Sequence, residues 1–425
     1  METERAVLLA CQVAYESKSM STRCDGHGEP VGVVLFQLGG PDSLESVEPF
    51  LENLFSDPDI IDFPFARLAR PALARLIASR RAKHARQHYA SIGGKSPLRE
   101  LTDLQARALE SELRKSIAAR VFVAMRYWHP STEEVAREVD AQPFRNLVLL
   151  PLYPQYSKTT TGSSFNEWNR RYRPEAARKT PVRVVRQFYD HPGYLDAVVE
   201  KINQGLAWFG GVDSRQAGER QAALLRATLV VAGAPHGPVH DVSGAPHSDC
   251  AESRPNPQAA TASSVNPSPY IQLAPGKHLA PDVNSAPDIR LIFSAHGVPQ
   301  SVIEAGDPYQ EQVEATVELV MSHGGWRNPY ALCYQSRVGP GRWLAPSLCE
   351  TLVRLAREGA ARVLVIPIAF VSEHVETLSE IGIEARELAY RLGIRQFEVM
   401  PALNDSPKFI QALAELVLGT LDRSA

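Results

Sequence analysis

Short apolar runs with almost no polar interruption alternate along this chain with longer stretches of helical periodicity. Uninterrupted apolar runs are typical of strands that are buried on both faces, as in a parallel sheet. The predicted strands cover residues 31–38, 121–126, 147–152, 182–188, 291–293, 330–334 and 362–370. The predicted helices cover residues 104–117, 194–208, 304–321, 348–358, 373–392 and 407–421. This alternation predicts an α/β fold with parallel sheets flanked by helices.

The order of strand ends in the first part of the chain is repeated in the last part. An apolar strand with an internal proline occurs in each part, as Leu150-Pro151-Leu152 and Ile366-Pro367-Ile368. Proline is uncommon inside strands because it cannot donate a ladder hydrogen bond. We therefore infer two similar α/β halves, residues 30–210 and 289–425, that face one cleft. A chance match is the alternative.

Two segments lack this patterning. Residues 211–288 are crowded with Pro, Ala, Ser and Gly, and such a segment cannot bury enough apolar area to offset its ordering entropy. We expect a largely disordered insertion there, in which the scattered histidines are incidental. Residues 1–29 are expected to be a disordered extension, with a true start at Met20 as the alternative, because their acidic beginning is unlike that of a signal peptide.

Composition narrows the class of protein. The 425 residues are 44% hydrophobic and 22% charged, with a net charge of -3, so no general attraction to nucleic acid is expected. The five cysteines have no CxxC spacing, which argues against a zinc knuckle, an iron-sulfur cluster or a disulfide framework. No apolar run approaches the roughly 18 residues of a membrane span. We expect a cytoplasmic protein.

A basic segment interrupts this neutral background. Residues 63–99 contain no acid, while arginines and lysines are spaced among leucines and isoleucine. Basic amphipathic helices bind membrane surfaces or form a lip that receives an apolar anion. We expect peripheral contact with the inner membrane through residues 63–86, with a simple solvated helix face as the alternative.

His296 follows the apolar run Leu291-Ile292-Phe293, at the point where the chain turns at Gly297. Ligands of open α/β sheets bind beyond the carboxyl ends of the strands, so this histidine is placed for chemistry. A hydrogen-bonded structural role is the alternative for a histidine in isolation.

A row of carboxylates follows the last predicted buried strand. Its members Glu373, Glu376, Glu380 and Glu384 are spaced to form a single stripe on a helix. Like charges at these spacings repel, so a solvated acidic face is one interpretation. The position beside the cleft favours another, a path for a hard cation or for protons with His296 at the opposite wall.

Aromatic and hydroxyl side chains follow two other predicted strands. Residues 126–130 include Arg126 and Tyr127, and residues 153–164 include Tyr153 and Ser157. Aromatics and hydroxyls that gather beyond strand ends suit a flat aromatic ligand.

Taken together, these residues resemble the ferrochelatase family, which inserts ferrous iron into a porphyrin at the end of haem synthesis. The resemblance covers residues 31–209 and 289–418, and rests on five ordered motifs at Leu38-Gly39-Gly40-Pro41, 151–164, Ser294-Ala295-His296-Gly297, 334–340 and 367–380. It implies two Rossmann-like, chelatase-type halves around a porphyrin cleft. It also implies that porphyrin and ferrous iron are substrates, with no permanently bound cofactor.

By resemblance, His296 and Glu376 are the catalytic and iron-contacting residues. We expect His296 to accept the pyrrole proton or to pass iron, with Glu376 facing it across the macrocycle. The resemblance places Arg126, Tyr127, Tyr153 and Ser157 against the porphyrin, and Arg126 near a propionate. The side chains of Glu373, His374 and Glu380 are expected to shape the metal or proton route.

The chain departs from the family in the acidic helix. The usual Glu-Leu-Asp-Ile-Glu-Tyr is here the run from Glu380 to Ala385, which lacks the aspartate and the tyrosine. No cluster of cysteines matches the iron-sulfur cluster of some members. The leading hypothesis is insertion of iron into protoporphyrin. Insertion into coproporphyrin or another tetrapyrrole, and a non-catalytic tetrapyrrole carrier, remain alternatives.

Overall fold

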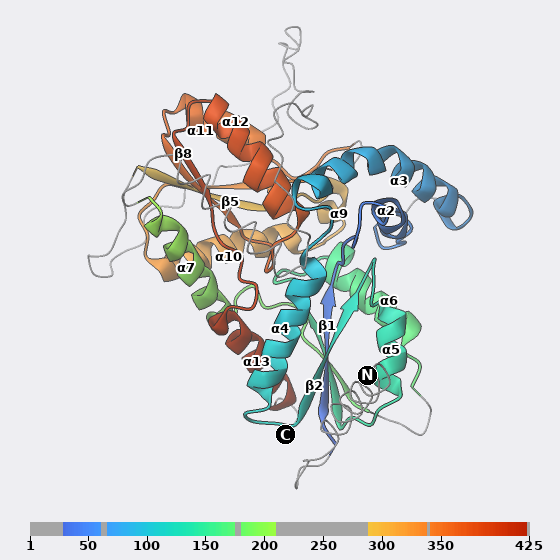
Figure 1. The fold of residues 1–425 in the computed structure, drawn as a ribbon. Helices are drawn as coiled ribbons and strands as arrows, with labels where there is room; N and C mark the ends of the chain where they lie inside the picture. The colour runs from blue at the N-terminus through green and yellow to red at the C-terminus, as the bar shows by residue number, and fades with distance from the viewer. Residues whose placement is uncertain (1–28, 61–65, 175–179, 210–287, 338–340, 423–425) are drawn as a thin grey trace, which may run out of the picture.

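The computed structural model describes residues 29–60, 66–174, 180–209, 288–337 and 341–422 (Figure 1). The expected N-terminal extension and nearly all of the expected insertion at 211–288 therefore lie outside the described residues. Among the described residues, no helix is long and apolar enough to cross a membrane.

The first sheet is parallel and has the strand order β2-β1-β3-β4. Its strands are β1 (Val31–Gln37), β2 (Ala119–Met125), β3 (Asn146–Pro151) and β4 (Val182–Val184). Every residue of β1 is buried, as its unbroken apolar run predicts for a central strand. The edge strand β4 is shorter than the predicted 182–188, and its valines are exposed.

The second sheet repeats this arrangement, with the order β6-β5-β7-β8. Its strands are β5 (Ile289–His296), β6 (Tyr330–Gln335), β7 (Arg362–Pro367) and β8 (Gln396–Val399). Pro151 and Pro367 both end the strand beside the central one, so the repeated order of strand ends is confirmed. The prediction missed β8, since its four buried residues include Gln396 and Glu398.

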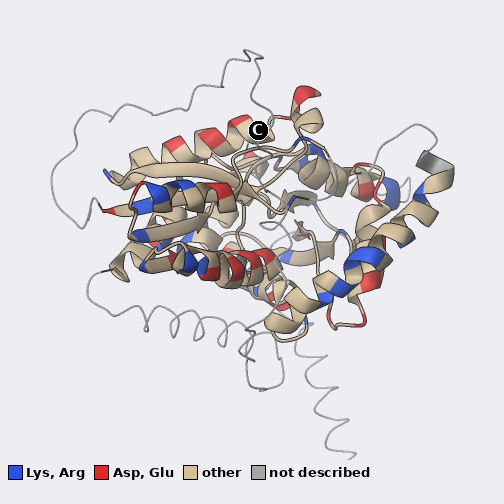
Figure 2. Ribbon diagram, turned by 90° about the horizontal axis from the view of Figure 1, so that it is seen from above, with Lys and Arg blue, Asp and Glu red and all other residues tan. Residues whose placement is uncertain are grey.

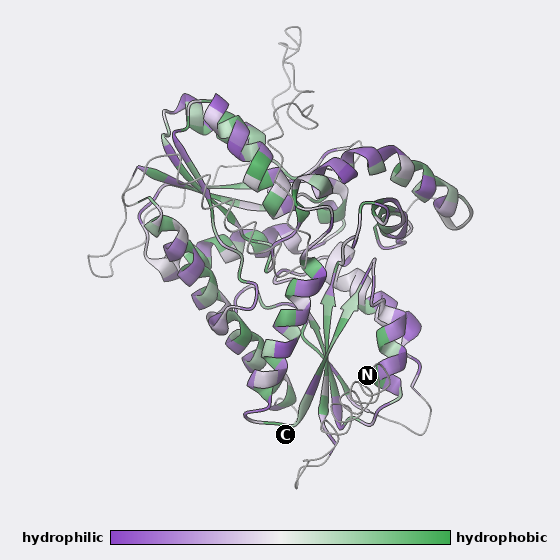
Figure 3. Cartoon of the chain, in the orientation of Figure 1, coloured by the Kyte–Doolittle hydropathy of each residue, from purple (hydrophilic) through white to green (hydrophobic). Residues whose placement is uncertain are grey.

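Helices cover both sheets and connect their parallel strands. They are α2 (Val47–Phe55), α3 (Ala66–Ser91), α4 (Leu98–Leu113), α5 (Thr132–Asp140), α6 (Ser163–Arg171), α7 (Pro192–Ala207), α9 (Gln300–Glu304), α10 (Tyr309–Gly324), α11 (Leu348–Arg357), α12 (Arg386–Arg391) and α13 (Pro407–Asp422). Two π-helical segments, η1 (Lys158–Gly162) and η2 (Glu376–Ala385), lead into α6 and α12. Apolar positions gather on the strands and polar positions on the outer helix faces (Figure 3).

The last helix of each half lies on the sheet of the other half. The C-terminal helix α13 packs against α4, β3 and β4 of the first half, and α7 packs against α10 and β7 of the second. A Cβ added to Gly205 of α7 would lie 2.9 Å from Cδ1 of Leu364 in β7, so the helix packs closely on this strand. The expected halves, 30–210 and 289–425, therefore describe the two sheets and not the helices that cover them. One hydrophobic core runs through both.

The helix α3 projects from the body together with α2, and Lys and Arg positions run along it (Figure 2). On α3, Ala74, Ala78 and Ala82 are buried in a small apolar cluster with α2, while Leu76 is 46% exposed. The predicted basic segment is thus an arm that rests on α2.

Candidate active site

A cavity of about 1320 Å³ lies beyond the carboxyl ends of the strands of both sheets. Residues that follow β1 and β3 line it from the first half, and residues that end or follow β5, β6 and β7 line it from the second. Apolar side chains of α2 and α3 line it as well, among them Phe50, Leu51, Leu54 and Ile77. Its volume exceeds the roughly 300–1,000 Å³ of ordinary small-molecule pockets and suits a large apolar ligand.

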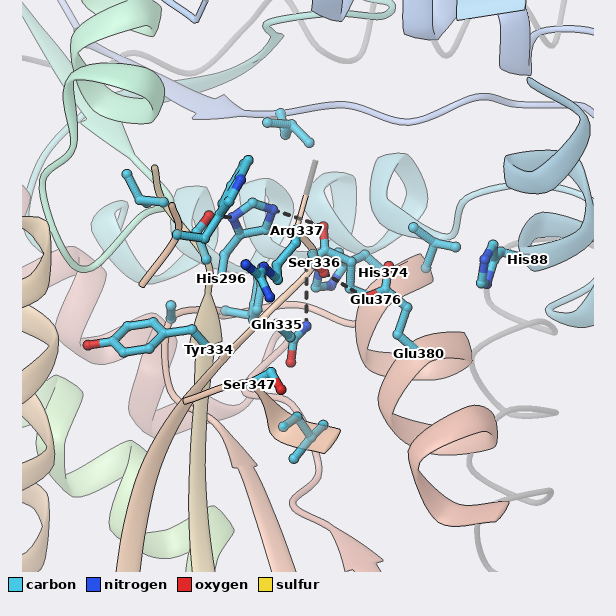
Figure 4. A pocket seen from close by; sticks show the side chains of 18 of the residues that line it. His88, His296, Tyr334, Gln335, Ser336, Arg337, Ser347, His374, Glu376 and Glu380 are labelled. Atoms are coloured by element: carbon cyan, nitrogen blue, oxygen red, sulfur yellow. Dashed lines mark hydrogen bonds and ion pairs between the residues drawn. The ribbon is translucent and has the colours of Figure 1, made fainter. Parts of the chain in front are cut away.

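His296 is the last residue of β5 and lines this cavity (Figure 4). Its Nδ1 lies 2.6 Å from the carbonyl oxygen of Gly297, and a carbonyl can only accept, so Nδ1 carries the proton in the neutral ring. The other nitrogen, Nε2, then presents a lone pair. The side chain is 38% exposed, which leaves Nε2 free to accept a proton or to bind a metal ion.

Glu376 is the first residue of η2, and its Oε1 lies 3.6 Å from Nε2 of His296. Its other oxygen, Oε2, accepts hydrogen bonds from Gln335 Nε2 at 3.3 Å and Ser336 Oγ at 3.0 Å. Burial by itself raises the pKa of Glu376, but the neighbouring His296 and His374 outweigh it and lower the pKa to about 2. Glu376 is therefore a carboxylate at neutral pH.

Glu376 was expected to face His296 across the macrocycle, and in the structure it lies beside His296. A separation of 3.6 Å leaves no room for a ring between the two side chains. The reason is topological, because β5 and β7 are adjacent parallel strands and each side chain follows the carboxyl end of one of them. Both side chains therefore border the same part of the cavity.

The carboxylate row is shorter than the predicted stripe. Residues 371–374 form a turn, and the helix begins at Val375 with a π-helical segment in place of the predicted regular helix over 373–392. The wider turn of a π-helix keeps residues four apart close to one line. The cavity is accordingly lined by Glu376, Glu380 and Glu384.

Glu373 does not belong to this row. Its carboxylate accepts hydrogen bonds from Thr377 Oγ1 at 2.5 Å and from the backbone N–H of Ala402 at 3.2 Å, and it is absent from the cavity lining. Burial raises its pKa. His374, by contrast, lines the cavity, with its ring 4.3 Å from that of Phe370 and its Nε2 3.9 Å from Glu376. Glu373 holds the turn in place, and His374 takes part in the site.

Ser336 joins two carboxylates, with its Oγ 3.0 Å from Glu376 Oε2 and 2.6 Å from Glu380 Oε2. A hydroxyl has one proton to donate, so one carboxyl group must donate in return. Glu380 is that group, because burial and the charge of Glu376 raise its pKa to about 7. Ser336 itself has a φ of 62°, a left-handed conformation that is unusual outside glycine and is often found at functional sites.

This raised pKa predicts a pH effect on stability. The folded protein holds the Glu380 proton up to about pH 7, whereas the pKa of a free glutamate side chain is 4.5. Between these values the native state binds more protons than the unfolded state, so the free energy of unfolding falls as pH rises. Urea unfolding at intervals from pH 5 to 8 should show a shallower decline for Glu380→Gln than for wild type. Equal slopes would contradict a raised pKa for Glu380.

Arg126 and Tyr127 lie outside the cavity lining. Arg126 Nη2 is 2.9 Å from Oδ2 of the buried Asp57, and Tyr127 donates to the same oxygen at 2.6 Å. The Arg126 guanidinium thus neutralises a buried carboxylate and is not free for a propionate. Tyr153 and Ser157 do line the cavity, and Ser157 donates to Asp307 of the other half at 3.0 Å.

Sequence reasoning assigned none of the arginines that line the cavity, which are Arg81, Arg337, Arg354, Arg357 and Arg391. Arg81 of α3 and Arg337 after β6 both line the cavity. Arg81 belongs to the basic segment and Arg337 to the motif at 334–340, so both were noticed, but neither was assigned to the ligand. The available signal for Arg337 was its position just after the predicted strand at 330–334, and the structure pairs that strand with β5 and brings the residues after it to the cavity.

Comparisons with known proteins identify the family of this chain. The profile of the family described as Ferrochelatase matches residues 30–227 and 263–421, so part of the expected insertion lies outside the match. Proteins named ferrochelatase from Synechocystis and Thermosynechococcus vestitus are 40% and 41% identical over 92% and 91% of this chain, and 83% and 81% of their own length. The ferrochelatase of Gloeobacter violaceus is 39% identical over 92% of this chain and 98% of its own. This chain therefore belongs to the ferrochelatase family.

Proposed function

We propose that this protein inserts ferrous iron into protoporphyrin to give protohaem. One observation carries the proposal: a histidine and a carboxylate 3.6 Å apart face a large, mainly apolar cavity in a member of this family. The reaction exchanges two pyrrole N–H protons for one ferrous ion, so it needs a proton acceptor and a place for a cation on the same face of the ring.

His296 and Glu376 divide these tasks. The lone pair on Nε2 of His296 accepts a pyrrole proton, and the Glu376 carboxylate at 3.6 Å stabilises the imidazolium that forms. The anionic Glu376 also attracts the ferrous ion to the face from which the proton leaves. Glu380, reached through Ser336, is the next group along the row that can hold a proton near neutral pH.

The two walls of the cavity orient the porphyrin. Apolar residues of α2 and α3 cover one face of the ring, and His296 and Glu376 meet the other. Arg81 and Arg337 supply the positive charge that propionates require, in place of Arg126, which is occupied by Asp57. Iron enters this scheme as a substrate, and we propose that the enzyme needs no resident cofactor.

An anaerobic assay with ferrous iron tests the proposal. Protoporphyrin and coproporphyrin are supplied in parallel, and the loss of free-porphyrin fluorescence is followed. We expect turnover with protoporphyrin. Turnover of coproporphyrin alone would keep the chemistry and change the substrate, and tight binding of both without metallation would identify a carrier.

The exposed side of α3 predicts a membrane contact. Leu76 is 46% exposed on this basic helix, whereas Ile77 lines the cavity, so among the described large apolar side chains of α3 it is Leu76 that can enter a membrane surface. Leu76→Ser should lower co-sedimentation with anionic liposomes severalfold and leave turnover of detergent-dispersed porphyrin unchanged. The matched control is Leu319→Ser, an exposed leucine on α10. If both variants lose liposome binding equally, or if neither loses it, Leu76 does not contact the membrane.

A further inference from the structure

Two histidines of α3 meet at the far end of the carboxylate row. His84 and His88 are one helical turn apart, and their Nε2 atoms are 2.9 Å from each other. Both line the cavity. In Figure 4, Glu376 and Glu380 lie between His296 and His88. The pair is therefore separate from the His296–Glu376 pair but opens into the same cavity.

A carboxylate fixes the protonation of one of these rings. Nδ1 of His88 lies 2.9 Å from Oε1 of Glu384, and Ser379 Oγ lies 3.0 Å from the same nitrogen. An ionised carboxylate only accepts hydrogen bonds, so Nδ1 of the neutral ring carries the proton and Nε2 presents a lone pair toward His84. Histidines that bind metal ions are commonly held by a carboxylate in this way.

The two Nε2 atoms share a proton across their 2.9 Å contact, and in neutral rings this proton belongs to His84. A divalent cation can take its place between the two nitrogens when the proton moves to Nδ1 of His84, because histidines four residues apart on a helix can bind one metal ion. Two metal–nitrogen bonds of about 2.0–2.1 Å at a tetrahedral angle place the nitrogens about 3.4 Å apart. The rings would have to separate by only about half an ångström, and the half-buried ring of His84 borders the open cavity.

We infer that His84 and His88 form a docking site for a first-row divalent cation, held in place by Glu384, from which ferrous iron passes along Glu380 to Glu376. That the bound ion is iron rests on the proposed function, whereas the existence of a cation site does not rest on it. Among the described residues no three such side chains converge on one point. The site therefore offers two protein ligands, and water completes the coordination, as suits an ion that must be released.

The charges around the pair are balanced for such a role. Arg81, one turn earlier, opposes a cation, and Glu384 attracts it. We therefore expect the divalent cation to bind this pair weakly and reversibly.

Cobalt(II) binding to the full-length protein tests the site without any porphyrin. Equilibrium dialysis compares wild type with His84→Ala, His88→Ala and Glu384→Gln. Loss of the outer carboxylate alone typically costs about 10–100-fold in metal affinity, so each variant should lose at least about tenfold at one site. The matched control is His129→Ala, an exposed histidine whose Nδ1 lies 3.0 Å from Glu134 outside the cavity. It should bind cobalt as wild type does.

A kinetic measurement separates this inference from the proposed function. If the protein is a ferrochelatase, His84→Ala should raise KM for ferrous iron and leave kcat at saturating iron within about twofold. Cobalt affinity equal to wild type in both histidine variants would overturn the inference, whether or not the enzyme turns over. A raised KM for porphyrin with unchanged cobalt affinity would overturn it too, and would assign the pair to a propionate. Because His88 also contacts η2, His84→Ala is the variant whose fold is least affected.

Discussion

His296→Ala should lower kcat for metallation of protoporphyrin by about 10²–10⁴-fold, the usual contribution of a positioned general base. The alanine variant has no group at the end of β5 to accept the pyrrole proton. Porphyrin binding should persist, since the apolar wall and the arginines of the cavity are unchanged. Fluorescence titration measures binding, and the anaerobic assay measures turnover of the same sample.

A histidine far from the cavity provides the control. His323 is 41% exposed, close to the 38% of His296, and is bonded to Asp196 on the surface. His323→Ala should turn over like wild type. Turnover by His296→Ala at the wild-type rate would show that this histidine is not the proton acceptor.

Glu376→Gln should lower kcat by about 10²–10³-fold, comparable to the loss of one preorganised electrostatic contact at a reaction centre. The amide keeps the shape and the hydrogen bonds but loses the charge that stabilises the His296 imidazolium and attracts iron. It also removes the neighbouring charge that helps raise the pKa of Glu380. The group titrating near pH 7 should therefore shift to lower pH, visible in the pH profile of the residual activity.

The control for this substitution is Glu133→Gln, which neutralises a surface carboxylate paired with Arg137. It should change neither kcat nor the pH profile. A Glu376→Gln enzyme with wild-type kcat would mean that the negative charge beside His296 has no part in the reaction.

The strands were predictable because their residues are buried on both faces. The apolar runs in β1 and β5 are typical of central strands of a parallel sheet. Pro151 and Pro367 lie in the strands that pair with them, at corresponding positions of the two sheets. The packing of α7 and α13 on the opposite half was not predictable from periodicity. An amphipathic pattern shows that one face of a helix is buried, but it does not show which sheet buries that face. The structure reveals the partner of α7 through its packing on α10 and β7, including the close approach of Gly205 to Leu364.

The sequence predicted which residues form the site but not how their side chains are arranged. His296 and Glu376 stood out because chemistry-bearing residues followed buried strands, and the structure brings them together. Their placement side by side depends on the strand order, which a sequence pattern does not contain. Arg126 was misplaced because its partner Asp57 is 69 residues earlier in the chain, where nothing in the local sequence indicates a buried carboxylate.

A crystal structure of the protein with protoporphyrin bound would decide whether one face of the ring receives both catalytic groups. We predict that the macrocycle fills the cavity, that His296 and Glu376 both contact its pyrrole nitrogens from the same side, and that the apolar residues of α2 and α3 cover the opposite side. A ring that separates His296 from Glu376, or one bound outside this cavity, would contradict the mechanism.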